Sequence, residues 1–118
     1  MRFLIALLLA SPAFAMDFPL KSGDVPFDRA AMEARLSGKI LTFYDNGKSR
    51  YYADGRYSYT YFGDERESAG GYWRVTDEGV VCVEFITGHA RCDLYVQNGA
   101  RLVLIDAKGD RYPVRPEE

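Results

Sequence analysis

The chain offers few of the side chains that enzymes use for acid–base or nucleophilic chemistry. His89 is the only histidine and stands beside a predicted turn, where a histidine is commonly solvated. The sequence contains no G-x-S-x-G, H-E-x-x-H, P-loop or dinucleotide-binding motif. Glu84 and Asp93 are conceivable as a carboxylate pair for glycoside hydrolysis, but the strand register predicted below projects them to opposite faces of a hairpin. We therefore expect a non-enzymatic protein, with a carboxylate-based hydrolase as the second alternative.

The two cysteines, Cys82 and Cys92, are interpreted as a disulfide. Residues Val80–Phe85 and His89–Val96 read as two strands, and residues 86–88 can form a three-residue hairpin loop that ends in glycine. This register places the two cysteines directly opposite each other, at a separation that a disulfide can bridge. The bridge is expected to stabilise the fold by about 2 to 3 kcal/mol. A redox-active or metal-binding pair is disfavoured because the spacing is not C-x-x-C.

No metal or cofactor is expected. Asp64, Glu65 and Glu67 are acidic, but they lack the spacing and the glycine of a calcium-binding EF-hand loop. They belong to a predicted solvated, mobile loop from Gly63 to Gly71, which is a candidate for contacting a partner.

The first fifteen residues have the pattern of a secretory signal peptide. Arg2 gives a basic start, Phe3–Ala10 is an apolar run too short to span a bilayer, and residues 11–15 offer an A-x-A cleavage site. Residues 16–118 are then expected to form a single small domain in the periplasm or outside the cell. We expect no integral membrane segment after cleavage, because no second apolar run of spanning length follows.

The charge pattern argues against nucleic acid as a partner. The formal net charge is −2, and the basic residues are scattered singly among acidic ones. Nucleic-acid binding requires clustered Lys and Arg that displace counterions from phosphates.

One short helix is predicted after an extended and mobile segment from Met16 to Val25. Asp28 is a good N-cap, Met32 can pack on Phe27 as a hydrophobic staple, and the helix should end near Ser37 before Gly38. Its expected apolar stripe consists of Phe27, Ala30, Ala31 and Ala34. We expect this helix to cover one mouth of a larger β structure.

From Lys39 onward, turn signals recur at intervals of about one strand plus one turn. The predicted strands between them are Ile40–Tyr44, Ser49–Ala53, Arg56–Phe62, Tyr72–Thr76, Val80–Phe85, Arg91–Val96, Arg101–Ile105 and Arg111–Val114. Such short connections join antiparallel neighbours. The predicted fold is therefore mainly β: an up-and-down antiparallel meander of about eight short strands, closing into a small barrel or a strongly bent sheet. Trp73 should anchor the core on the same face as Val75.

Six of the nine tyrosines lie between residues 44 and 61. If Asp54-Gly55 is a two-residue turn, three cross-strand pairs share one face. We call this set the tyrosine strip; it pairs Tyr52 with Tyr57, Arg50 with Tyr59, and Lys48 with Tyr61. The strip is either one wall of the core or an exposed surface suited to stacking on sugars or docking a partner.

Several short motifs resemble a loosely defined group of small secreted proteins that is frequent in alphaproteobacteria. They are Leu36-Ser37-Gly38-Lys39, Asp54-Gly55-Arg56, Gly71-Tyr72-Trp73 and the pair Cys82 and Cys92. The resemblance implies a periplasmic location, and it carries no known activity.

Together these observations predict a non-enzymatic exported protein that binds an envelope protein or a glycan through the tyrosine strip or the Gly63–Gly71 loop. The first alternative is a lipocalin-like carrier of a small apolar ligand. Such a carrier needs an interior cavity of at least a few hundred Å³.

Overall fold

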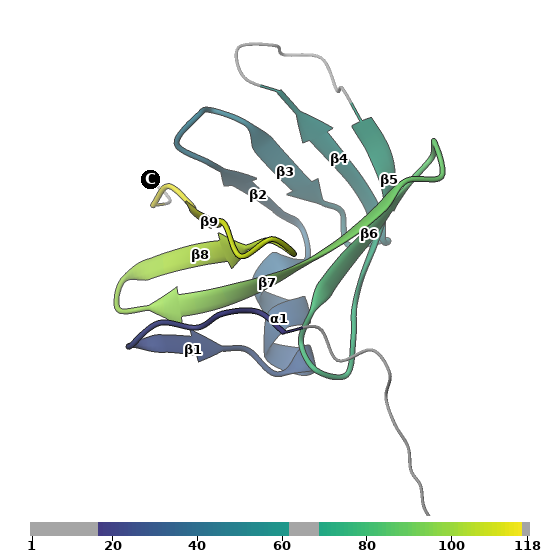
Figure 1. Ribbon diagram of the computed structural model, residues 1–118. Coiled ribbons are helices and arrows are strands. Elements are labelled where there is room, and N and C mark those ends of the chain that lie inside the picture. The colour runs from purple at the N-terminus through teal and green to yellow at the C-terminus, as the bar shows by residue number, and fades with distance from the viewer. Residues whose placement is uncertain (1–16, 62–68, 117–118) are drawn as a thin grey trace, which may run out of the picture.

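The computed structural model describes residues 17–61 and 69–116, which form one curled β half-barrel with a short helix (Figure 1). The elements are β1 (Asp24–Pro26), α1 (Arg29–Leu36), β2 (Lys39–Thr42), β3 (Lys48–Tyr51), β4 (Arg56–Thr60), β5 (Ala69–Val75), β6 (Val81–Phe85), β7 (Ala90–Asn98), β8 (Arg101–Ile105) and β9 (Arg111–Pro113). The predicted signal peptide lies outside the described residues. So does most of the predicted Gly63–Gly71 loop, whose last three positions belong to β5 instead.

The predicted antiparallel meander is confirmed. Strands β2 to β9 are neighbours in sequence order, and every pairing between them is antiparallel. Of the two predicted forms of closure, the sheet adopts the strongly bent one. Its first and last strands meet beyond their ends, through a bridge between Phe43 and Val114 and a 2.8 Å hydrogen bond from the Arg115 amide to the Thr42 carbonyl.

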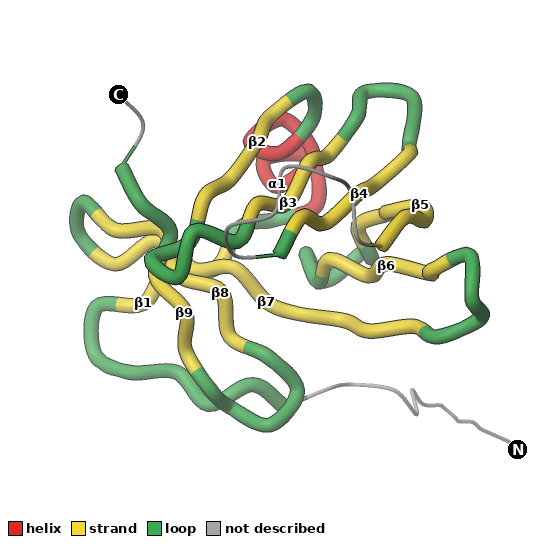
Figure 2. The backbone as a smooth tube through the Cα atoms, turned by 90° about the horizontal axis from the view of Figure 1, so that it is seen from above, coloured by secondary structure: helices red, strands yellow, loops and turns green. Residues whose placement is uncertain are grey.

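The strand β7 is shared between two parts of the sheet. Its first half pairs with β6, whereas its second half pairs with β8 on one edge and with β1 on the other (Figures 1 and 2). Residues Asp93 to Val96 are all buried, because one core covers one face of this stretch and a second core covers the other. The main core lies on the concave side of the sheet, and a second core lies behind β7 and β8. The second core consists of Leu94, Val96, Val103 and Ile105, with Phe18 and Val80 packed against it.

The N-terminal segment corrects one prediction. Residues Met16–Val25 were expected to be extended and mobile, but within the described part Phe18 packs on the second core and Asp24–Pro26 pairs with β7. The physical reason is the second apolar face of β7 and β8, which would otherwise face water. None of the helical structure in residues 17–61 and 69–116 has the length and apolarity needed to cross a bilayer.

A partly buried ion pair joins β1 to β9. The Asp24 side chain is fully covered and accepts two hydrogen bonds from the Arg111 guanidinium, both 2.9 Å long. It also accepts from the Lys21 amide at 2.7 Å and from the Asn98 side chain at 2.8 Å. These hydrogen bonds, those of Arg111 first, hold the pKa of Asp24 well below its usual range.

The substitution Asp24→Asn should lower the free energy of unfolding at neutral pH by about 1.5–3 kcal/mol, the range for hydrogen bonds to a charged group. The folded-state pKa of Asp24 lies below its unfolded value of 3.8. Its ionised form therefore stabilises the fold above that value, and this contribution is lost as the pH falls. Urea unfolding of both proteins between pH 7 and pH 2 should show the difference shrinking with acidity. A difference independent of pH would contradict this account.

The helix α1 begins at the predicted residue, but the side chains that it buries are not the predicted ones. The Asp28 carboxylate accepts a 2.8 Å hydrogen bond from the Ala31 amide, which confirms the N-cap. The buried helix residues are Met32 and Leu36, one turn apart, with Phe27 packed beside them. The expected stripe was wrong in part, because Ala30, Ala31 and Ala34 are exposed. Two long side chains reach the core at one end of the half-barrel, where α1 contacts β2 and β5.

The hairpin of β6 and β7 confirms the predicted register. Cys82 and Cys92 are directly opposite each other and their sulfurs are at bonding distance, 2.08 Å. The Phe85 amide donates to the His89 carbonyl at 2.8 Å, and Gly88 takes a positive φ of 95° in the loop. The predicted alternation of β5 is also confirmed: Trp73 and Val75 face the core, whereas Tyr72 is exposed.

A tyrosine-lined pocket as candidate binding site

The hairpin that carries the tyrosine strip has a different turn from the predicted one. Its loop contains three residues, Ala53 to Gly55, and Gly55 adopts a positive φ of 99°. The Tyr52 amide donates to the Arg56 carbonyl at 2.9 Å, so Tyr52 stands opposite Arg56. The Trp73 indole N–H also donates to the Tyr52 carbonyl at 2.8 Å, which holds this end of the hairpin against β5.

The extra loop residue shifts the predicted pairs by one position. Tyr51 stands opposite Tyr57, Ser49 opposite Tyr59, and Lys48 opposite Thr60. Because side chains alternate between the faces of a strand, this shift separates the residues of the strip.

The structure therefore divides the tyrosine strip between the two faces of the sheet. Tyr57, Tyr59 and Tyr61 are on the concave face and line one pocket. Lys48, Arg50 and Tyr52 alternate with the inward-facing Ser49 and Tyr51 and belong to the other face. The prediction of a single six-residue surface was wrong. The tyrosines also differ in exposure: Tyr57 is 7% exposed and part of the core, Tyr59 is half-buried, and Tyr61 is 57% exposed.

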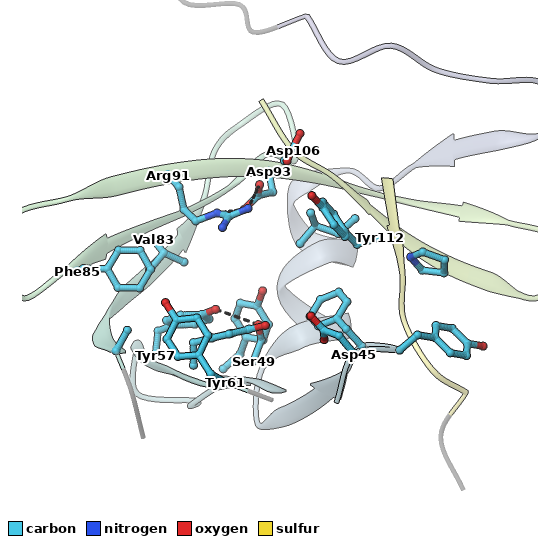
Figure 3. Close-up of a pocket in the computed structure, with 17 residues that line it drawn as sticks. Asp45, Ser49, Tyr57, Tyr61, Val83, Phe85, Arg91, Asp93, Asp106 and Tyr112 are labelled. Carbon is cyan, nitrogen blue, oxygen red and sulfur yellow. Dashed lines mark hydrogen bonds and ion pairs between the residues drawn. The ribbon is translucent and has the colours of Figure 1, made fainter. Parts of the chain in front are cut away.

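The pocket occupies the concave face of the half-barrel and has a volume of about 450 Å³. In Figure 3, Tyr57, Tyr61 and Ser49 form one side, and Arg91, Asp93 and Tyr112 form the facing side. The lining residues are Phe43, Tyr44, Asp45, Ser49, Tyr51, Tyr57, Tyr59, Tyr61, Ala69, Val83, Phe85, Arg91, Asp93, Leu104, Asp106, Tyr112 and Pro113. Most of this surface is aromatic or aliphatic, which is typical of sites for small molecules.

Buried hydroxyl pairs fix the floor of the pocket. The hydroxyls of Tyr51 and Tyr95 are 2.7 Å apart, and the Ser49 hydroxyl lies 2.9 Å from that of Tyr57. The Tyr51 ring also meets the Trp73 ring edge to face, with centroids 5.3 Å apart. Burial raises the pKa of Tyr57 to about 12, so this phenol is neutral at physiological pH. The floor is thus a rigid aromatic layer whose polar atoms are already paired.

One wall carries an ion pair. Arg91 and Asp93 are two residues apart on the same face of β7, and the guanidinium binds both carboxylate oxygens at 2.8 and 2.9 Å. Burial raises the pKa of the Asp93 carboxyl despite these bonds, and the same bonds raise the pKa of Arg91. The bidentate geometry fixes the position of both side chains.

Two further carboxylates line the pocket from turns. Asp45 accepts a 2.9 Å hydrogen bond from the Gly47 amide, in the turn after β2. Asp106 accepts from the amides of Lys108 and Asp110, at 3.0 and 2.9 Å, in the turn after β8. These bonds fix both carboxylates at the pocket by local turn chemistry.

Gly47 supports the half-buried Tyr59 ring. A Cβ atom at residue 47 would overlap the Tyr59 hydroxyl, so Gly47→Ala must displace the ring. We expect a loss of about 1–3 kcal/mol in the free energy of unfolding, the range for overpacking, and shifted Tyr59 ring resonances in NMR spectra. The matched control is Gly70→Ala, whose Cβ would make only ordinary contacts, the nearest at 3.7 Å. Equal stability of both variants would show that Tyr59 does not rest on Gly47.

The carboxylates considered for hydrolysis do not share a site. Glu84 is exposed on the outer face of β6, whereas Asp93 is buried on the concave face, which confirms the predicted opposite orientation. His89 is exposed, as expected, and stacks on the Phe85 ring with centroids 6.0 Å apart. Within residues 17–61 and 69–116, no cluster of three His, Cys, Asp or Glu side chains is arranged to hold a metal ion. Asp64, Glu65 and Glu67 lie outside the described residues.

The arrangement has the features of a binding site for a small ligand. It offers a large aromatic surface, a fixed ion pair and two carboxylates held by turns, and the lining includes no histidine or cysteine. Comparisons of the chain with known protein families, curated proteins and solved structures find no match.

Proposed function

We propose that this protein is an exported, non-enzymatic binding protein that holds a small, largely apolar ligand in the pocket of its half-barrel. The observation that carries the proposal is the aromatic cavity of about 450 Å³ on the concave face. Ligand pockets in proteins are typically about 300–1,000 Å³ and mainly apolar. The cavity thus has the size that the carrier alternative requires.

The division of the tyrosine strip favours this role over the docking of an envelope protein or glycan on a flat surface. Tyr57 is a core residue, and it lies on the opposite face from Lys48 and Arg50. What remains of the strip on the concave face, Tyr59 and Tyr61, borders the pocket. Aromatic side chains of this kind bind a small molecule by enclosing it.

Export is supported by the basic start, the apolar run and the A-x-A site in residues 1–15. The bonded cysteine pair agrees with an oxidising compartment. The resemblance to small secreted proteins points the same way.

The test is a fluorescence titration with N-phenyl-1-naphthylamine, an uncharged dye that brightens in apolar sites. The wild-type protein should bind it, and Ala69→Trp should weaken binding at least about tenfold, because Ala69 lines the pocket and a large ring would fill it. The matched control is Tyr72→Ala on the same strand, which removes a 62% exposed outward ring and should leave binding unchanged. No binding by the wild type, or equal binding by Ala69→Trp, would overturn the proposal.

A further inference from the structure

The charges around the pocket do not cancel. Four charged residues line it, namely Asp45, Arg91, Asp93 and Asp106. The single cation among them is engaged by both oxygens of Asp93. In the part of the chain that the structure describes, Asp45 and Asp106 accept hydrogen bonds from backbone amides only and form no ion pair. Among the described lining residues, three carboxylates therefore face one guanidinium, and neither Asp45 nor Asp106 is ion-paired to it.

The rings beside these carboxylates are tyrosines, whose faces can attract a cation. Tyr59 and Tyr61 meet edge to face with centroids 5.0 Å apart, and Tyr112 lines the facing side. The face of a tyrosine ring is electron-rich and attracts ammonium and guanidinium groups. The rim already shows such a contact, because the Arg115 guanidinium lies over the Tyr44 ring at 5.7 Å from its centroid.

The field of the carboxylates reaches the rings. Desolvation raises the pKa of Tyr112, and the negative charges of Asp106, Asp110 and Asp45 raise it further, whereas the positive charge of Arg91 acts against them. Burial likewise raises the pKa of Tyr59, with Asp45 as the next contribution. An anionic ligand would meet this same repulsion, whereas a cation would be attracted by carboxylates and rings together.

We propose that the ligand of this pocket is an organic cation, an ammonium or guanidinium group joined to an apolar body. This inference rests on the proposed function and specifies its ligand class. The apolar body lies on the aromatic floor over Tyr51 and Tyr57, and the cationic group lies between the tyrosine rings and the carboxylates of Asp45 and Asp106.

The test compares the affinities of three probes of matched size. Each affinity is measured by NMR titration of the intact protein. The probes are benzyltrimethylammonium, its uncharged carbon isostere neopentylbenzene, and the anion phenylmethanesulfonate. The cation should bind about tenfold more tightly than the neutral isostere, and more tightly still than the anion. Its affinity should fall as salt is raised, whereas that of the neutral isostere should not.

The double variant Asp45→Asn/Asp106→Asn should remove the preference for the cation and leave the neutral isostere unchanged. Asparagine retains an oxygen that can accept from the same turn amides, so the loops are preserved. The matched control is Asp77→Asn, which removes one exposed carboxylate that pairs with Arg29 at the helix. It should keep the full preference.

The outcomes separate the two proposals. The cation assignment would be overturned if the neutral or anionic probe bound as tightly as the cation or more tightly, or if the double variant kept the preference. In that case, binding of N-phenyl-1-naphthylamine would still support the carrier proposal. If neither the dye nor any of the three probes binds, both proposals fail.

Discussion

Truncation of Tyr51 to alanine should lower the free energy of unfolding by about 3–5 kcal/mol, the range for removing a large aromatic side chain from a core. Tyr51 is 3% exposed and its ring contacts Tyr57, Trp73 and Tyr95. The loss is large because the lining cannot close over so big a cavity. The total free energy of unfolding of a small domain is about 5–15 kcal/mol. The substitution should therefore shift the midpoint of urea unfolding to a much lower urea concentration.

Phenylalanine variants separate the hydroxyls from the rings. Tyr51→Phe or Tyr95→Phe leaves the other hydroxyl buried without its 2.7 Å partner and should cost about 1–3 kcal/mol. The double variant removes both polar atoms and should be less destabilised than the sum of the two single variants. Tyr61→Ala is the control, because this ring is 57% exposed and its loss should change stability by about 0.5 kcal/mol at most. Strict additivity of the two Phe substitutions would contradict a direct hydroxyl pair.

Loss of the disulfide should have the second large effect. Replacing Cys82 and Cys92 by alanine is expected to lower the free energy of unfolding by about 2–3 kcal/mol, since the closed loop spans a sequence separation of 10. The stabilisation arises mainly in the unfolded chain, whose freedom the bridge restricts.

The measurement is urea unfolding with and without dithiothreitol. The reductant should destabilise the wild type to about the level of the alanine pair and leave the alanine pair unchanged. The prediction would be contradicted if the urea midpoint of the wild type were unchanged after reduction, provided that both thiols are shown to be free.

The meander could be predicted because its information is local. Turn glycines with positive φ, such as Gly79, Gly88 and Gly109, stand where the sequence signalled turns. The cysteine register followed from one short loop ending in Gly88. Asp28 capped the helix through a hydrogen bond to a residue three positions away.

The face of the tyrosines could not be predicted, because it depends on a single loop residue. Asp54-Gly55 fits both a two-residue turn and the end of a three-residue loop. The choice between them moves every side chain of a strand to the other face. The longer loop is favoured by the hydrogen bond from the Trp73 indole to the Tyr52 carbonyl. This contact joins residues far apart in sequence, so the local sequence does not reveal it.

An interior cavity was one of the predicted alternatives, but most of its lining residues could not be predicted, for a related reason. Asp45 and Asp106 come from different turns, Arg91 comes from β7, and only the curl of the sheet brings them together. One signal was available: Arg91 and Asp93 stand two residues apart on one face of β7, and Tyr57 and Tyr59 do so on one face of β4. Alternating polar residues on the inner face of a curled sheet mark an interior that is not wholly packed with apolar side chains.

The pairing of β1 with β7 also has a consequence for the order of folding. Asp24 and Asn98 are partners although 74 positions separate them, whereas the hairpins from β2 to β9 close over short loops. Closing the longer loop is entropically more demanding, so β1 can dock only after β7 and β8 have formed. Its amides should therefore exchange with solvent through a partial opening that leaves the meander intact. We therefore expect β1 to join the sheet only after the strand with which it pairs has formed.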